Sequence, residues 1–257
     1  MPTPPRFHRP PPPGPGEAPR SATPSTGSGI GDWVVLKNNQ LLAFNKPPGL
    51  AVQSATADAP TLQRLASAYA KRDLYLIHRI DQPASGLVLF ARHRKAVQKL
   101  QAQFASREVR RVYLAVVEAP PEAPEGELRH HLVRDGRSNK SAVVEAGVGG
   151  AKEAVLTWRQ VGATERYPIL GVELQTGRHH QIRAQLAAVG APVHGDVKYG
   201  ARRANADRGI HLHARELSFR HPVSGEAVDL TAALPGEDAL WAAVGDAIGG
   251  PHRGAGR

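Results

Sequence analysis

Short hydrophobic runs separated by polar turns occupy most of the chain, and this pattern is typical of β-strands. We expect strands at 33–36, 40–45, 86–92, 108–118, 153–161 and 169–175, and later within GIHLHARELSFRHP and EAVDLTA. Apolar residues recur at helical spacing in 60–72, 95–105 and 179–190. Because strands dominate and helices do not alternate regularly with them, we predict an α+β fold with a mixed, largely antiparallel β-sheet and flanking helices.

Prolines divide the chain into three parts. Residues 1–30 hold 10 of the 22 prolines, so this segment is unable to bury a core and we expect a disordered, proline-rich tail. The folded body is predicted at 31–245, and residues 246–257 are expected to form a short, disordered basic tail. The proline- and glutamate-rich segment 120–126 is expected to be a loop that splits the body into two portions.

Charge and composition narrow the class of protein. Lysine and arginine total 33 against 23 aspartate and glutamate, which gives a net charge of +10 and favours a polyanionic partner. The absence of cysteine excludes disulfides and thiolate metal sites. No apolar run approaches the roughly 20 residues that span a bilayer, and the N-terminus lacks the apolar segment of a signal peptide. We therefore expect a cytoplasmic protein with no membrane association.

Charged residues follow an apolar run in LIHRIDQPASGLVLFAR, residues 76–92. On an extended segment Arg79 and Asp81 point the same way, so the two charges are expected to be neighbours. A carboxylate at a buried strand end is unfavourable unless a cation pairs with it. One interpretation is a structural aspartate that caps the turn. The other is a reactive carboxylate, because an aspartate held ionised beside arginine needs no activation to act as a nucleophile or base.

A second basic cluster lies in TGRHHQIRAQLAAVG, residues 176–190. Arg178, His180 and Arg183 crowd the predicted first turns of a helix, where backbone N–H groups and the helix dipole favour phosphate or carboxylate. The alternative is a capped helix with a solvated basic face. In the following GDVKYG turn, Asp196 is interpreted as a structural helper and not as a catalytic group.

Two histidine pairs raise the question of a metal site. His179 and His180 are adjacent, so their side chains are expected to point apart, whereas metal-binding histidines on a helix are often four residues apart. His211 and His213 are able to share one face of a strand. No carboxylate is spaced to complete a ligand set with them. We therefore predict that the protein binds no metal ion.

Two further segments place cations beside a turn or an aromatic ring. In NKPPGLAV, residues 45–52, Lys46 leaves a strand into a Pro-Pro-Gly turn, where it either meets phosphate or is solvated. In RRVYLAV, residues 110–116, Arg111 and Tyr113 share one strand face. Nucleic-acid-binding proteins use such an arrangement to stack an unpaired base. Taken alone, Tyr113 also fits a tyrosine of the core or its rim.

Together these motifs resemble the large-subunit-type RNA pseudouridine synthases, the RluA family. HRIDQPASGLVLFAR is similar to the family signature H-R-L-D-x-x-T-S-G-L-L-L-F-A-K, and NKPPGLAV is similar to N-K-P-x-G-L-x-V. RVYLAVV resembles the K-x-Y-x-A strand, and TGRHHQIRAQLAAVGAPVHGDVKYG resembles T-G-R-x-H-Q-I-R-x-H-x-x-x-x-G-x-P-I-x-G-D-x-x-Y-G. HLHARELSFRHPVSG resembles the late L-H-A-x-x-L-x-F-x-H-P segment. The five motifs follow the family's order over about residues 34–235.

This resemblance implies the fold of a pseudouridine synthase catalytic domain and a set of roles. It implies Asp81 as the catalytic aspartate and Arg183 as the cation that pairs with it and orients it. It implies that Tyr113 stacks on the target base and that Arg79 helps to hold the flipped nucleotide or its phosphate. The implied reaction is isomerisation of uridine to pseudouridine in structured ribosomal or transfer RNA, with base flipping and without a cofactor or metal.

The departures from the family pattern include three at which we expect a structural effect. Ala84 stands in place of threonine and Val88 in place of leucine, and we expect only packing changes from both. Gln185 replaces a histidine, which is expected to alter how the helix with Arg183 is held or how RNA is gripped. Many relatives carry an S4-type RNA-binding domain at the N-terminus. Here only the proline-rich segment precedes the catalytic body, so we expect that domain to be absent.

Two other functions are left open by the sequence. One is a non-catalytic RNA-binding protein on this scaffold, which the presence of Asp81, Arg183 and Tyr113 disfavours. The other is a hydrolase that uses Asp81 with His78. The sequence disfavours it, because it shows neither a set of metal ligands nor a separate nucleophile–base pair. The sequence leaves open which RNA and which uridine are the target. We expect a monomer, because no separate interface motif is visible.

Overall fold

The computed structural model describes residues 29–54, 59–236 and 238–249. The predicted body lies almost entirely within these residues. The predictions of disorder for the N-terminal segment 1–30 and for the C-terminal segment 246–257 fall mainly outside them. Within the described part, the last helix continues to Ala247. No helix of these residues is long and apolar enough to cross a membrane.

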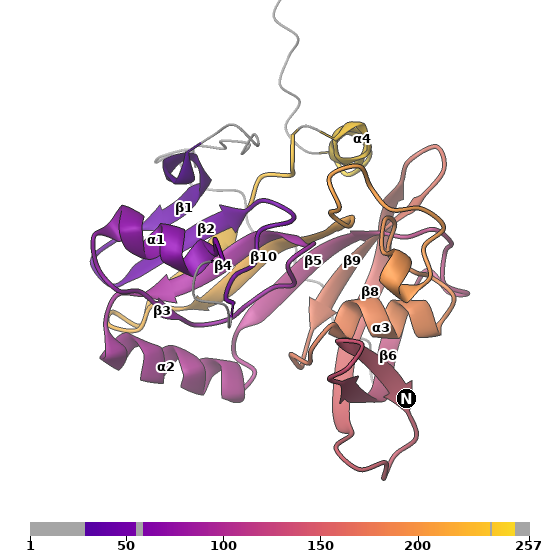
Figure 1. The fold of residues 1–257 in the computed structure, drawn as a ribbon, viewed down its shortest axis with the longest axis horizontal. Coiled ribbons are helices and arrows are strands. Elements are labelled where there is room, and N and C mark those ends of the chain that lie inside the picture. The colour runs from indigo at the N-terminus through magenta and orange to yellow at the C-terminus, as the bar shows by residue number, and fades with distance from the viewer. Residues whose placement is uncertain (1–28, 55–58, 237, 250–257) are drawn as a thin grey trace, which may run out of the picture.

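The helices and strands follow the order that Figure 1 shows. The strands of the first half are β1 (Val34–Lys37), β2 (Leu41–Lys46), β3 (Tyr75–Leu76), β4 (Ser85–Ala91) and β5 (Arg110–Val116). Those of the second half are β6 (Glu125–Asp135), β7 (Lys140–Val144), β8 (Lys152–Ala163), β9 (Pro168–Leu174), β10 (Leu212–Arg220) and β11 (Ala227–Thr231). The α-helices are α1 (Leu62–Ala70), α2 (Arg94–Ala105), α3 (Gln181–Ala188) and α4 (Ala239–Ala247), and the 3-10 helices are η1 (Ile30–Trp33) and η2 (Val197–Tyr199).

One continuous sheet forms the centre of the described part. Its strand order is β1-β2-β4-β10-β5-β9-β8-β6-β7, with β11 beside β10 and β3 beside β4. Strands β4 and β10 pair in parallel, and the other neighbouring strands pair antiparallel. Helices α1, α2 and α3 cover the sheet face toward the viewer in Figure 1. The predicted α+β fold with a mixed, largely antiparallel sheet is therefore confirmed.

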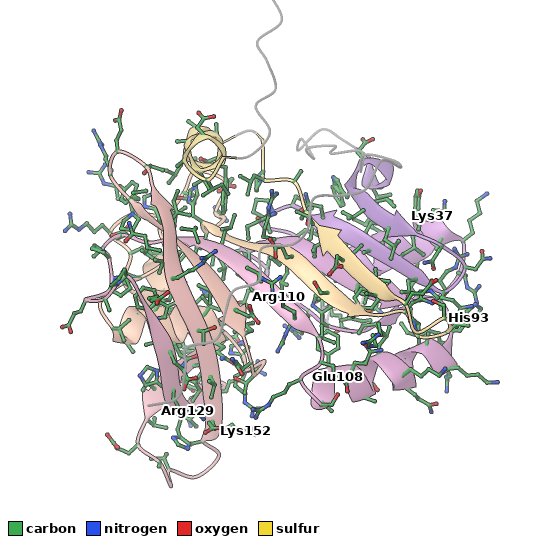
Figure 2. All side chains as sticks on the ribbon, turned by 180° about the vertical axis from the view of Figure 1, so that it is seen from behind. Lys37, His93, Glu108, Arg110, Arg129 and Lys152 are labelled. Atoms are coloured by element: carbon green, nitrogen blue, oxygen red, sulfur yellow. The ribbon has the colours of Figure 1, made fainter. Side chains whose placement is uncertain are left out.

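Strand β5 shows how alternation assigns side chains to the two faces of the sheet. Tyr113 belongs to the main core beneath the helices, whereas Leu114 packs on the opposite face with Trp241 of α4. Figure 2, which views the sheet from behind, labels Arg110 on this opposite face. Its guanidinium contacts one glutamate of β9 and one of β10, at 3.2 and 2.7 Å. The next residue, Arg111, consequently points toward the face that carries α2 and α3.

Two expectations about the fold are wrong or incomplete. Segment 120–126 does not split the body, because β5 pairs with β9, β9 with β8 and β8 with β6, which makes the sheet continuous. The hydrophobic pattern also misses the β6–β7 hairpin. In β6, Leu132 is the one fully buried residue, so this strand lacks the apolar alternation by which strands are recognised. The hydrophobic pattern likewise did not predict helix α4.

A glycine allows β4 and β10 to pair in parallel. Gly86 lies opposite Ala214 and has a φ of 110°, a backbone conformation that side chains disfavour. A Cβ atom at this position would meet the Ala214 carbonyl oxygen and would lie 2.6 Å from the Ala214 nitrogen. Since this pair joins the two halves of the sheet, residue 86 has little room to shift.

Gly86→Ala is expected to lower the free energy of unfolding by about 2–3 kcal/mol, because overpacking adds to the backbone penalty. The matched control is Gly200→Ala. Gly200 has a φ of 103°, but a Cβ there meets nothing within 4 Å, so only the backbone penalty of about 1 kcal/mol is expected. Urea unfolding of both variants measures the difference. Equal losses would contradict a steric role for Gly86.

Candidate active site

Asp81 lies in the loop between β3 and β4, next to the start of β4. The Ala84 N–H donates to the Asp81 carbonyl at 3.1 Å, and this bond closes a turn. Ala84 and Ser85 are buried, so the turn is anchored in the core. The Asp81 side chain remains 20% exposed. The chain thus places a carboxylate at the edge of the core, where it reaches open space while its backbone is fixed.

Lys46, at the end of β2, anchors this loop through hydrogen bonds to its backbone carbonyls. Its side chain is 0% exposed. The ammonium group donates to the carbonyls of Pro47, Gln82 and Ala84 at 2.8, 3.1 and 2.6 Å. Burial lowers the pKa of Lys46 to about 7, and the charge of Asp81 acts in the opposite direction. Neither a solvated lysine nor a phosphate ligand, as the sequence suggested, describes this residue, because the structure uses it to fix the loop that carries Asp81.

Lys46 is expected to make stability depend on pH. Between about pH 7 and 10 the folded lysine has lost its proton while the unfolded lysine, with an ordinary pKa near 10.4, retains it. The unfolded state then binds more protons, so the wild type gains stability as pH rises, by on the order of 3 kcal/mol relative to Lys46→Met. Urea unfolding at pH 6, 8 and 10 tests this, with the exposed Lys99→Met as control. A constant difference between wild type and Lys46→Met would contradict the prediction.

Arg183, on α3, connects two carboxylates. Its Nε and Nη2 atoms donate to Asp196 Oδ2 and Oδ1 at 2.6 and 2.8 Å, and its Nη1 donates to Asp81 Oδ2 at 3.2 Å. The side chain is only 4% exposed. Burial opposes its charge, yet the bonds and charges of Asp196 and Asp81 raise the pKa of Arg183 above the ordinary value. The two-pronged contact with Asp196 fixes the guanidinium, and this leaves the Nη1 group to orient Asp81.

His180 lies beside the same carboxylate, with its Nε2 atom 3.9 Å from Asp81 Oδ2. The Ser141 backbone N–H donates to the Tyr199 hydroxyl at 2.7 Å, and this hydroxyl lies 2.9 Å from His180 Nδ1. A backbone N–H only donates, so the hydroxyl proton is free to donate to Nδ1. Burial and the nearby Arg183 hold the pKa of His180 well below its usual range. His180 is therefore neutral with its proton on Nε2, facing Asp81.

The adjacent histidines do not point apart, as the sequence suggested. The rings of His179 and His180 stack with their centroids 3.7 Å apart. His180 has a left-handed backbone conformation with a φ of 52°, which the pattern argument did not include. Within the described residues, no group of three or more histidines and carboxylates is arranged to hold a metal ion. His211 and His213 do share one face, because both rings contact Trp241.

A cavity of about 650 Å³ opens beside Asp81, and we call it the Tyr113 cavity. Its walls come from the loop before β4, the end of α2, strand β5, the turn after β9 and the start of α3. Burial raises the pKa of Tyr113 to about 12, so its ring presents a neutral hydroxyl. Arg111 donates to the Leu174 carbonyl at 3.3 Å and lies over the Phe104 ring, 5.5 Å from its centroid. The cavity therefore combines flat apolar surface with positive charge.

Arg79 lines this cavity from its exposed rim. The described part of the chain shows no ion pair between Arg79 and Asp81, although the sequence argument made them neighbours. The argument required an extended strand, but β3 ends at Leu76 and residues 77–84 form a loop. The cation that contacts Asp81 comes instead from α3. The structure thus brings Asp81, Arg183, Tyr113 and Arg79 to one cavity.

Gln185, at a departure from the family pattern, anchors α3 to the sheet. Its side chain is buried, and its Nε2 atom donates to the carbonyls of Leu128 on β6 and Ala154 on β8, at 3.0 and 3.1 Å. Backbone acceptors of two strands therefore fix the helix two residues after Arg183. The two other departures, Ala84 and Val88, are buried in the core. The expectations that Gln185 affects how the helix is held and that the others concern packing agree with these positions.

The comparison with protein families decides the class of this protein. The family model of RNA pseudouridylate synthases matches residues 40–188, more than half of the chain. The chain belongs to this family. The match contains Asp81, Tyr113 and Arg183, and the predicted membership of the RNA pseudouridine synthases is confirmed by the same comparison.

Individual members of the family support the assignment. An uncharacterised RNA pseudouridine synthase of Mycoplasma genitalium is 31% identical over 78% of this chain, which spans 66% of that protein. The ribosomal large subunit pseudouridine synthase D of Zymomonas mobilis is 32% identical over 79% of this chain and 69% of its own length. The tRNA pseudouridine synthase C of Haemophilus ducreyi is 30% identical over 81% of this chain and 92% of its own length. This chain thus spans about two thirds of the first two relatives.

Among solved structures, the human RNA pseudouridylate synthase domain containing 4 shares the fold. The TM-score is 0.68 with 22% identity, and the match covers 85% of this chain and 94% of that chain. The sequence did not point to Tyr199 or Ser141 as residues of the candidate site. Tyr199 stands within the quoted GDVKYG turn, so a signal existed, whereas Ser141 lies on the unpredicted strand β7. Nothing in the sequence pattern pointed to that serine.

Proposed function

We propose that the protein isomerises specific uridines to pseudouridine in structured RNA, with Asp81 as the catalytic group and the target base flipped into the Tyr113 cavity. The observation that supports this assignment best is the contact of 3.2 Å between Arg183 Nη1 and Asp81 Oδ2 at the edge of that cavity. This contact pairs the carboxylate with a buried cation and directs it. Membership of the pseudouridine synthase family supports the reaction class.

The reaction exchanges one glycosidic bond for another. The C1′–N1 bond of uridine breaks, the uracil turns, and a C1′–C5 bond forms, after which C5 loses its proton and N1 gains one. Bond breaking leaves C1′ electron-poor and the uracil anionic. Ionised Asp81 either attacks C1′ or takes a proton from the sugar, and both routes need the charge that Arg183 stabilises.

The detached uracil has to remain in place while it turns. Tyr113 offers a buried, neutral ring on which the base stacks. Arg111 offers positive charge toward the anionic uracil, because it lines the same cavity, and Asp81 is the one carboxylate among the described lining residues. Removing the base from a helix costs a few kcal/mol. Three arginines on the cavity walls, Arg107, Arg134 and Arg178, supply contacts to phosphate that offset this cost.

The RNA class is ribosomal or transfer RNA. One relative is named for the large ribosomal subunit and another for tRNA, at nearly equal identities to this chain. We expect the protein to act as a cytoplasmic monomer, without cofactor or metal. Chromatography with light scattering on the purified chain tests the monomer, and a mass of two chains would contradict it.

Tritium release tests the proposed reaction. Ribosomal and transfer RNA from a strain that lacks this protein are prepared with uridine tritiated at C5. The wild-type protein is expected to release tritium from at least one of the two fractions, because C5 loses its hydrogen when the new bond forms. Nucleoside analysis of the same RNA is expected to show pseudouridine. Binding without release would support a non-catalytic RNA-binding protein, and free uracil or cut chains would support a hydrolase.

A further inference from the structure

A second cavity, of about 640 Å³, lies on the other side of Asp81, and we call it the Arg208 cavity. It shares a wall with the Tyr113 cavity, formed by Arg79, Ile80, Asp81, His179, His180 and Arg183. Its other lining residues come from the segment after β2, the loop before β4, the β6–β7 turn, η2 with the two residues before it, and the loop that follows η2. Asp81 therefore faces two cavities of nearly equal volume, each roomy enough for a nucleotide-sized ligand.

The Arg208 cavity carries excess positive charge. Arg79, Lys198 and Arg208 line it. Lys198 donates to the Ser138 and Asn139 carbonyls at 3.1 and 3.2 Å, so its charge meets backbone oxygens and not a carboxylate. The carboxylates among its lining residues are those of Asp81 and Asp196, and Arg183 engages both. Within the described lining, three cations thus have no carboxylate to neutralise them, which favours a phosphate ligand.

The inner surface of the same cavity is apolar. Val52, Pro83 and Ile210 line it, and Val52 and Ile210 are themselves buried. Amide side chains of Gln53, Gln82 and Asn139 stand around this surface. An apolar surface bordered by amides and cations matches the parts of a nucleotide, which are a flat base with hydrogen-bonding edges, a sugar and a phosphate.

We propose that the Arg208 cavity binds the nucleotide next to the target uridine in the RNA chain. The inference rests on the proposed function, which assigns the uridine to the Tyr113 cavity because Tyr113 lines that cavity alone. The two nucleotides then lie on opposite sides of Asp81, and the backbone between them passes Arg79, which lines both cavities. The base of this neighbouring nucleotide then contributes to substrate selection, because it has to fit the Arg208 cavity. Arg208 and Lys198 bind the phosphate of the same nucleotide.

Binding of a short RNA tests this site without requiring activity. The probe is a single-stranded pentauridylate with a 5′ fluorophore, and its binding is measured by fluorescence anisotropy. The KCl concentration is varied from about 50 to 200 mM, because phosphate contacts are sensitive to salt in this range. Arg208→Gln is expected to weaken binding about 10-fold and to reduce the salt slope by about one. The matched control is Arg72→Gln, an exposed arginine after α1 that lines neither cavity. It is expected to bind like wild type.

A variant that changes no charge tests whether the RNA occupies the cavity, independently of the attraction between charges. Ala204→Leu adds aliphatic volume at an exposed position of the Arg208 cavity and is expected to weaken binding several-fold with an unchanged salt slope. Equal affinities of Arg208→Gln and Arg72→Gln, or a wild type that does not bind the probe, would overturn the second site. The tritium assay distinguishes this failure from that of the proposed function. If the wild type releases tritium but Arg208→Gln and Arg72→Gln bind the probe equally, the second site alone is excluded. If Arg208→Gln binds more weakly but the wild type releases no tritium, the isomerase activity alone is excluded.

Discussion

Asp81→Asn is expected to lower the rate of pseudouridine formation by about 10⁴-fold or more, as removal of the central group of a catalytic site does. The amide is isosteric with the carboxylate but carries no charge, so it neither attacks C1′ nor takes a proton. The fold should persist, because Arg183 retains both bonds to Asp196. RNA affinity should also persist, since the change removes negative charge from a site that binds a polyanion.

Single-turnover tritium release, fluorescence anisotropy with RNA and urea unfolding measure these three properties. The matched control is Asp229→Asn, an exposed aspartate on β11 outside both cavities, which should behave as wild type in all of them. Turnover of Asp81→Asn within tenfold of wild type would exclude Asp81 as the catalytic group. A rate loss accompanied by unfolding would leave the chemistry to be tested with Asp81→Glu, which retains the charge but displaces it.

Arg183→Ala is expected to reduce stability by about 3–5 kcal/mol, the effect of removing one partner from a buried ion pair. Asp196 is almost fully buried, and in this variant it loses two charge-assisted hydrogen bonds at once. Asp81 loses the cation that directs it, so the rate should also fall by at least about 100-fold. This variant therefore affects folding and catalysis together, whereas Asp81→Asn affects catalysis alone.

Arg183→Lys separates the two effects. Lysine retains the charge but presents a point donor in place of the planar fork, so it is able to neutralise the carboxylates without reproducing the contacts to both. Stability should recover by more than half, while the rate remains low. Urea unfolding and single-turnover kinetics of both variants give the comparison. A loss below about 1 kcal/mol for Arg183→Ala, the range of exposed pairs, would contradict a buried network.

The fold was predictable where residues follow a period. Strand β4 is a continuous apolar run, and α2 spaces its apolar residues for one face, so both were found to within a residue or two. The β6–β7 hairpin was missed because its side chains remain largely exposed, and exposure removes the pattern. The false division at 120–126 arose because prolines mark a loop but do not reveal which strands pair across it.

The candidate site was predictable only as a set of motifs. Asp81, Arg183 and Tyr113 stand in five ordered motifs, and the structure places them around one cavity. Lys46 was misjudged because its partners include carbonyls 36 and 38 residues away, and burial of this kind depends on how β2 and β4 pair. The stacking of His179 on His180 depends on one left-handed residue, which a spacing argument does not contain.

The place of β10 in the sheet determines when a newly made chain acquires its site. This strand lies between β4 and β5, and His213 on it meets Ser85, 128 residues earlier. During synthesis from the N-terminus, the half that carries Asp81 and the half that carries Tyr113 have no shared strand until β10 leaves the ribosome. Such distant pairing is slow to form. A ribosome-bound chain that ends before β10 therefore lacks the assembled cavity, even though every residue that lines it except Leu212 has already been synthesised.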